Sequence, residues 1–138
     1  MEKRNKEFLT RIQTFMDGKT GITSSQNLRG DYYPLDANNV GTFDLQEGRH
    51  GDAQLVKFKR KFFKPRFFAH PIRAYYLASS YNQTRTISIT NHAEVFFTDT
   101  LTGCLFAAYG PNRFNLTVEH TNAFSLGQPA ILARRALI

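Results

Sequence analysis

Two residues in the last third of the chain, Cys104 and His120, carry the side chains that thiol chemistry requires. A thiol is a poor nucleophile until it becomes a thiolate, and an adjacent imidazolium lowers its pKa. The same imidazole can then protonate a leaving group. The pair therefore predicts catalysis with Cys104 as the nucleophile and His120 as the acid and base.

A predicted β-hairpin brings these two residues together. Cys104–Tyr109 and Phe114–Thr121 have strand character and flank the turn signal Gly110-Pro-Asn-Arg. A turn centred on Asn112 places Cys104 directly opposite His120, where Cβ atoms lie about 4.5–5.5 Å apart. A loop with an odd number of residues gives this register, and an even number displaces it by one residue. His120 is expected at the margin of the core, where a cleft can reach it.

Residues just before Cys104 suit a supporting role. Gly103 allows close approach of the backbone, so N–H groups around Gly103 and Cys104 could stabilise an oxyanion. A third group must orient His120, and the Thr98 hydroxyl is a candidate, although a backbone carbonyl would serve as well. The alternative is that Cys104 is a small buried hydrophobe and that His120 and Thr98 are ordinary strand residues.

The elements that would position these side chains form an α+β domain. A helix over residues 3–16 is predicted by apolar residues at helical spacing, namely Phe8, Leu9, Ile12, Phe15 and Met16. A polar surface loop with short ordered pieces is expected over residues 18–52. Pro129 predicts the start of a short C-terminal helix. The expected fold is an antiparallel β-sheet or sandwich flanked by the two helices, as a single catalytic domain over residues 1–138. Besides the hairpin, strands are expected at 53–63, 74–79, 84–90 and 93–99.

Composition excludes several classes of protein. With 138 residues and one Cys, the chain is too short for two cores and cannot be an internally disulfide-bonded scaffold or a Cys-rich zinc domain. No apolar run approaches the roughly 18 residues of a membrane span, and the first residues lack a secretory signal. We expect a monomer with no membrane association. We also expect neither a cofactor nor a metal, because no phosphate loop, ligand cluster or paired carboxylates are present.

At Cys104 the sequence resembles a family of bacterial toxins. Phe97-Thr-Asp-Thr-Leu-Thr-Gly-Cys104 is similar to the Leu-Ser-Gly-Cys signature of the cytotoxic necrotizing factor and Burkholderia lethal factor deamidases, with Thr102 in place of Ser. The resemblance covers residues 97–121. It implies that Cys104 is the nucleophile, His120 the base and Thr98 an assisting threonine, on a β-sandwich flanked by helices.

The same resemblance implies a function. Those toxins convert a target glutamine to glutamate, so it predicts a secreted bacterial effector that acts in the host cytosol without a cofactor. Transglutamination, in which an amine replaces water at the thioester, uses the same residues and stays open.

The net charge of +7 is concentrated in one segment, since residues 53–93 hold eight Lys and Arg residues and no acid. Lys57, Lys59 and Lys61 share one face of the predicted strand, with Arg60 on the other. They suit docking on a host protein with an acidic surface and an accessible glutamine. The alternative is a solvated edge strand that lysines protect from aggregation.

The basic stretch also permits other classes of function. Cations interleaved with aromatic residues can grip phosphates and stack bases, as expected of a ribonuclease-like toxin or an RNA-binding module. His70, His92 or His120 would then be the acid and base. A non-catalytic interaction domain with an inert Cys104 is the remaining alternative.

Overall fold

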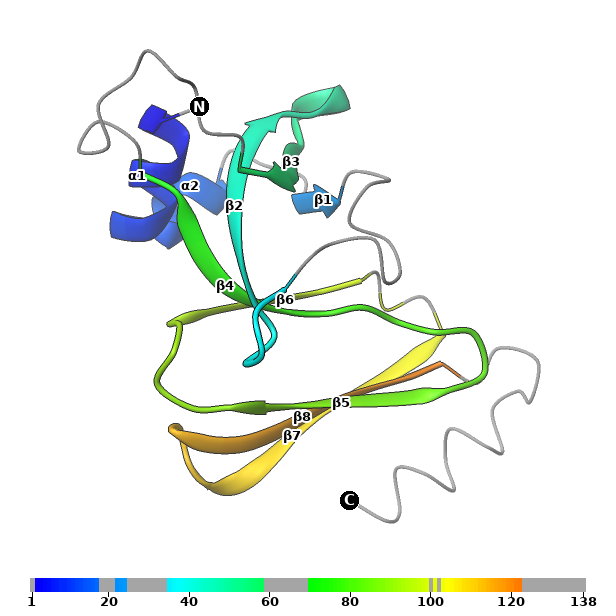
Figure 1. Cartoon of the computed structure of the whole chain (residues 1–138). Helices are drawn as coiled ribbons and strands as arrows, with labels where there is room; N and C mark the ends of the chain where they lie inside the picture. Colours follow the sequence, from blue (N-terminus) through cyan, green and yellow to red (C-terminus); the bar gives the residue numbers. More distant parts are fainter. Residues whose placement is uncertain are drawn as a thin grey trace. The chain divides into compact units, whose positions relative to one another are not determined.

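The computed structural model describes residues 2–17, 22–24, 35–58, 70–99, 101 and 103–122. Two helices and eight strands within these ranges establish an α+β fold, as predicted (Figure 1). The strands belong to two sheets, one of β1, β2, β3, β4 and β6 and one of β5, β7 and β8. Residues 1–28 and 42–73 make up one compact unit, and residues 29–41 and 74–138 make up a second. The predicted C-terminal helix lies outside the described residues.

The predicted N-terminal helix is two short helices, α1 (Glu2–Thr10) and α2 (Ile12–Asp17), interrupted at Arg11. Hydrogen bonds of helical spacing continue across the break, from Arg11 N to the Glu7 carbonyl (2.8 Å) and from Phe15 N to the Arg11 carbonyl (2.9 Å). No helix in the described part of the chain is long and apolar enough to cross a membrane.

The buried side of these helices differs from the predicted one. Phe8 and Phe15 are buried and meet edge to face with ring centroids 5.5 Å apart, whereas Leu9 and Ile12 are about half exposed. The buried Asn5 completes the inner side: it donates to Asp44, and its Oδ1 accepts the N–H of Leu45 (2.8 Å). A polar residue satisfied in this way can be buried without the cost of an unmade hydrogen bond.

Three strands complete the first unit: β1 (Ile22–Ser24), β2 (Val40–Glu47), which begins in the second unit, and β3 (Ala53–Lys57). β3 pairs with β1 in parallel and with β2 antiparallel, and the 3₁₀ helix η3 (Arg49–Gly51) lies between β2 and β3 in the chain. β2 falls in the region predicted as a loop with short ordered pieces over residues 18–52, and its eight residues make it longer than that prediction allowed. Asp44 made this stretch look like an exposed loop in the sequence, but in the structure it is buried and accepts a hydrogen bond from Asn5.

The second unit holds the predicted strands of the C-terminal half, except that Ile72 and Arg73 at the start of β4 belong to the first unit. They are β4 (Ile72–Leu77), β5 (Thr84–Ile89), β6 (Val95–Thr98), β7 (Cys104–Asn112) and β8 (Asn115–Asn122). β8 lies between β5 and β7 in an antiparallel sheet, but β6 runs parallel to β4. The purely antiparallel prediction is therefore wrong. β5 lies between β4 and β6 in the chain but belongs to the other sheet. The chain therefore crosses to that sheet before β6 pairs with β4 in the same direction.

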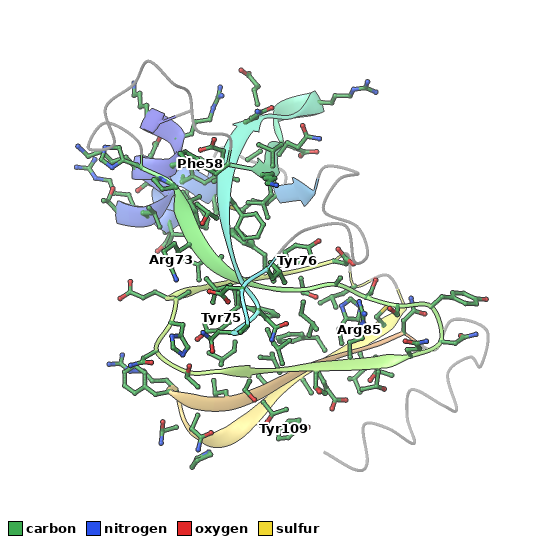
Figure 2. The ribbon with its side chains drawn as sticks, viewed as in Figure 1. Phe58, Arg73, Tyr75, Tyr76, Arg85 and Tyr109 are labelled. Carbon is green, nitrogen blue, oxygen red and sulfur yellow. The ribbon has the colours of Figure 1, made fainter. Side chains whose placement is uncertain are left out.

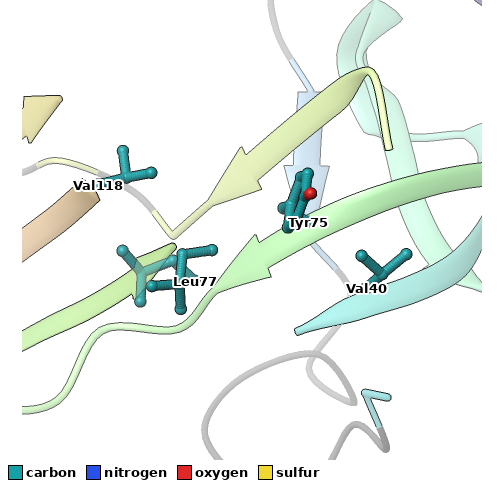
Figure 3. Packing of buried hydrophobic residues seen from close by; sticks show 5 residues of the cluster. Val40, Tyr75, Leu77 and Val118 are labelled. Atoms are coloured by element: carbon teal, nitrogen blue, oxygen red, sulfur yellow. The ribbon is translucent and has the colours of Figure 1, made fainter. Parts of the chain in front are cut away.

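The hydrophobic core of the second unit connects its two sheets. Val40, Tyr75, Leu77, Ile87 and Val118 form one buried cluster (Figure 3). Because Val118 and Ile87 are directly opposed on β8 and β5, this face of the three-stranded sheet packs against β4. We call it the inner face.

The hydroxyl of Tyr75 fixes the turn after β5. Its oxygen accepts the N–H groups of Thr90 (3.0 Å) and His92 (3.1 Å) and lies 3.3 Å from the Thr90 hydroxyl. Burial raises the pKa of Tyr75, but these hydrogen bonds outweigh burial and lower the pKa below its ordinary value. The Tyr75 oxygen thus accepts hydrogen bonds from two backbone N–H groups that lie beyond the end of β5.

Candidate active site

Cys104 and His120 lie diagonally across the β7–β8 ladder. In the observed register Cys104 pairs with Asn122, and His120 pairs with Phe106. The predicted direct pairing of Cys104 with His120 is therefore wrong by two residues. Both side chains still point to the inner face, because residues two apart on a strand share a face. Diagonal neighbours have Cβ atoms about 7–8 Å apart or somewhat less, within reach of longer side chains.

The turn accounts for this register. β7 continues to Asn112, which pairs with Asn115, so the loop is the two residues Arg113 and Phe114 rather than a turn centred on Asn112. The Asn112 side chain accepts the N–H of Phe114 (2.9 Å) and stabilises the loop. An even-numbered loop alone would turn Cys104 and His120 to opposite faces.

A β-bulge returns the two side chains to one face. The register shifts between Tyr109 and Asn112, where β7 carries one more residue than β8. Pro111 has no N–H for the ladder. Gly110 has φ +153°, and a Cβ there would lie 2.1 Å from the carbonyl oxygen of Asn115. Only glycine fits such a close approach of the two strands.

Thr98 meets His120 as a candidate orienting group should. Its hydroxyl lies 2.9 Å from His120 Nδ1 and donates to the carbonyl of Leu77 (2.8 Å). A hydroxyl has one proton. Since that proton goes to Leu77, the Thr98 oxygen accepts the Nδ1 proton of His120, and Nε2 carries the lone pair.

The Nε2 atom of His120 is buried and makes no hydrogen bond to the described residues. His120 is fully buried, so its predicted place at the margin of the core is wrong. β8 is the central strand, and β6 contributes the Thr98 that holds the ring. A buried nitrogen lone pair without a donor is costly for the fold, and it is the form that a general base must have.

The electrostatics of the site favour a neutral pair. Burial, and then the negative charge of Asp99, raise the pKa of the Cys104 thiol. Burial lowers the pKa of His120, and Asp99 opposes that shift only in part. The expected low thiol pKa is therefore contradicted. Both shifts favour a protonated Cys104 thiol and a neutral His120 imidazole at neutral pH.

The surroundings of Cys104 are partly open and apolar. Cys104 is half-buried, Gly103 has the left-handed φ of +69° that glycine adopts without strain, and Leu101 is 45% exposed. Phe106, opposite His120, is 37% exposed and has its ring centroid 5.7 Å from that of Phe96. The thiol is therefore partly exposed beside apolar surface residues, whereas the imidazole of His120 is fully buried.

Sequence reasoning missed Asp99 and the residues that hold it. Oδ1 of Asp99 accepts the hydroxyl proton of Tyr76, which is labelled in Figure 2, and Oδ2 accepts from the N–H (2.7 Å) and hydroxyl (3.1 Å) of Ser79. Its place directly after Thr98, within the motif before Cys104, was the available signal. Arg85, opposite His120 on β5, was also missed.

The basic residues proposed for docking are only partly described. Lys57 is exposed at the end of β3, and Lys59, Arg60 and Lys61 lie outside the described residues. Their role stays a prediction. Within the described ranges, no group of three or more His, Cys, Asp or Glu side chains could hold a metal ion.

Two comparisons of the sequence with known proteins found no match. No protein-family model matches the chain, and no curated protein is similar to it in sequence. Any function must therefore be argued from the residues of the site.

Proposed function

We propose that the chain is a protein-glutamine deamidase in which Cys104 is the nucleophile and His120 the general base. The observation that carries this proposal is the buried Nε2 lone pair of His120, held in that tautomer by Thr98, on the same sheet face as Cys104. A free imidazole lone pair and a protonated thiol on one sheet face are the two groups that concerted thiol activation needs.

The reaction has two halves and needs no cofactor. As the Cys104 sulfur attacks the glutamine carboxamide carbon, its proton moves to Nε2 of His120. The resulting oxyanion is stabilised by N–H groups near Gly103. Its collapse breaks the C–N bond, and the imidazolium protonates the departing nitrogen. Ammonia is released, and the substrate stays bound to Cys104 as a thioester.

Water completes the second half. His120 takes a proton from the water that attacks the thioester, and the C–S bond breaks. The imidazolium returns its proton to the Cys104 sulfur, and the substrate side chain is now glutamate. A primary amine in place of water would give transglutamination instead.

The target we propose is a folded host protein with an acidic surface, which Lys57, Lys59, Arg60 and Lys61 would engage. In this proposal the chain is a bacterial effector that acts in the host cytosol. The resemblance of residues 97–104 to the toxin signature supports this part, and the partly exposed thiol suits a macromolecular substrate.

The test compares wild-type protein with Cys104→Ser in host-cell lysate, followed by peptide mapping by mass spectrometry. We expect the wild type to convert one or very few glutamines to glutamate and the variant to convert none. An added primary amine separates transglutamination from hydrolysis. Equal conversion by both proteins would refute the proposal, as would RNA cleavage that needs a histidine but not Cys104.

A further inference from the structure

The carboxylate of Asp99 is held rigidly beside the candidate site. Asp99 directly follows Thr98 at the end of β6, and both of its oxygens accept hydrogen bonds from β4 or from the residues just after it. Tyr76 donates to one oxygen and Ser79 donates twice to the other. Three donated hydrogen bonds fix the carboxylate in place.

The segment of residues 76–79, which holds Asp99, also holds His120 through Thr98. Thr98 connects His120 Nδ1 to the carbonyl of Leu77, and Asp99 connects to Tyr76 and Ser79 on either side of Leu77 in the sequence. The imidazole and the carboxylate are thus anchored to one stretch of chain. A fixed charge in such a frame requires little reorganisation during a reaction.

The other groups that face His120 define its electrostatic surroundings. Arg85 lies opposite it on β5, Cys104 lies diagonally on β7, and Asp99 follows β6. Asp99 acts electrostatically on both His120 and Cys104. Of these groups, Asp99 is the one whose negative charge would favour a protonated imidazole and oppose a thiolate.

We propose that Asp99 is a positioning residue of the Cys104–His120 pair, whose charge stabilises the imidazolium that His120 becomes when it takes the thiol proton. This proposal rests on the proposed deamidase function. A cation formed in a buried site is costly unless a counter-charge is near. Asp99 supplies that charge while holding Cys104 as a thiol until substrate arrives.

The test is Asp99→Asn, which keeps the shape and removes the charge. NMR titration of the His120 ring and alkylation of Cys104 as a function of pH give two readouts that do not depend on turnover. We expect both titrations to move to lower pH. Deamidation at neutral pH should slow by about tenfold or more, although the thiol alkylates faster.

Ser79→Ala is the matched control, because it removes a hydrogen bond to Asp99 but keeps the charge. Its His120 titration should stay close to that of the wild type. Asp99→Ser gives a second uncharged variant if the asparagine variant does not fold. Titrations of His120 and Cys104 unchanged in an uncharged variant would overturn the role of Asp99. Absence of deamidation by the wild type would instead overturn the proposed function, whatever the titrations show.

Discussion

Cys104 and His120 share one face of the β7–β8 hairpin only because β7 carries an extra residue between Tyr109 and Asn112. The two-residue loop by itself places them on opposite faces. The candidate site therefore depends on a backbone irregularity at Gly110 and Pro111, six and seven residues after Cys104 in the chain. Neither residue takes part in the proposed chemistry.

Gly110→Ala should disrupt this register. A Cβ would collide with the Asn115 carbonyl, so the strands must separate or shift. We expect a loss of folding stability above the roughly 1–3 kcal/mol of backbone strain alone, measured by urea unfolding. Gly51→Ala is the control, since Gly51 also has a positive φ (+83°) but has open space around it. Equal losses in the two variants would contradict the steric role of Gly110.

The strands of the second unit were predictable because their residues alternate or are apolar throughout. The ends of β5 and the position of β6 follow from Thr84–Ile89 and Val95–Thr98 within one or two residues. Register was not predictable to the same degree. It depends on where the loop begins and on whether Gly110 and Pro111 lie in the strand or in the turn, and a run of turn-forming residues does not decide this.

The residues of the candidate site, like the strands, were predictable only in part. Thr98 could be proposed as a partner of His120 because its hydroxyl can orient an imidazole and because it matches the assisting threonine of the toxins that residues 97–121 resemble. Asp99 was missed although it directly follows Thr98, because its hydrogen bonds come from residues such as Ser79, 20 residues away, and from the parallel pairing of β4 with β6. Hydrogen bonds between distant segments leave no local pattern in a sequence.

Thr98→Val should release His120 from its tautomer. The variant keeps the shape of the side chain but leaves the Leu77 carbonyl and His120 Nδ1 without their hydroxyl. We expect a loss of about 1–3 kcal/mol in the free energy of unfolding. The ¹⁵N signals of the ring should indicate mixed tautomers. Thr98→Ser should restore both properties, and a ring that keeps its Nδ1 proton in the valine variant would show that another group sets the tautomer.

Tyr75→Phe should destabilise the second unit. The hydroxyl accepts the N–H groups of Thr90 and His92, and phenylalanine leaves these donors without their acceptor. A loss of about 1–3 kcal/mol is expected from unmade hydrogen bonds at a site that is almost fully buried. Tyr81→Phe is the control, because Tyr81 is 64% exposed. Similar stabilities for the two variants would mean that the Tyr75 hydroxyl contributes little.

The alkylation of Cys104 by iodoacetamide should become fast only at high pH. The pKa of the thiol is raised above the ordinary 9.0 by burial and by Asp99, so at pH 7 to 8 less thiolate is present than in an unfolded chain. Iodoacetamide should label the native protein more slowly than the same protein in denaturant, where Cys104 titrates normally. Because Cys104 is the only cysteine, Cys104→Ser gives the background.

Deamidation should respond to pH differently from this labelling. The active state carries one proton shared by Cys104 and His120, so it is lost when His120 is protonated or when the shared proton leaves at high pH. The pKa of His120 is lowered below 6.5, so activity should persist at pH 6.5 and decline only as the pH falls below it. We therefore expect substantial turnover at pH 7, where alkylation is slow. A labelling rate that reaches its plateau below pH 8 would contradict this, because it would mean that a thiolate–imidazolium pair forms before substrate binds.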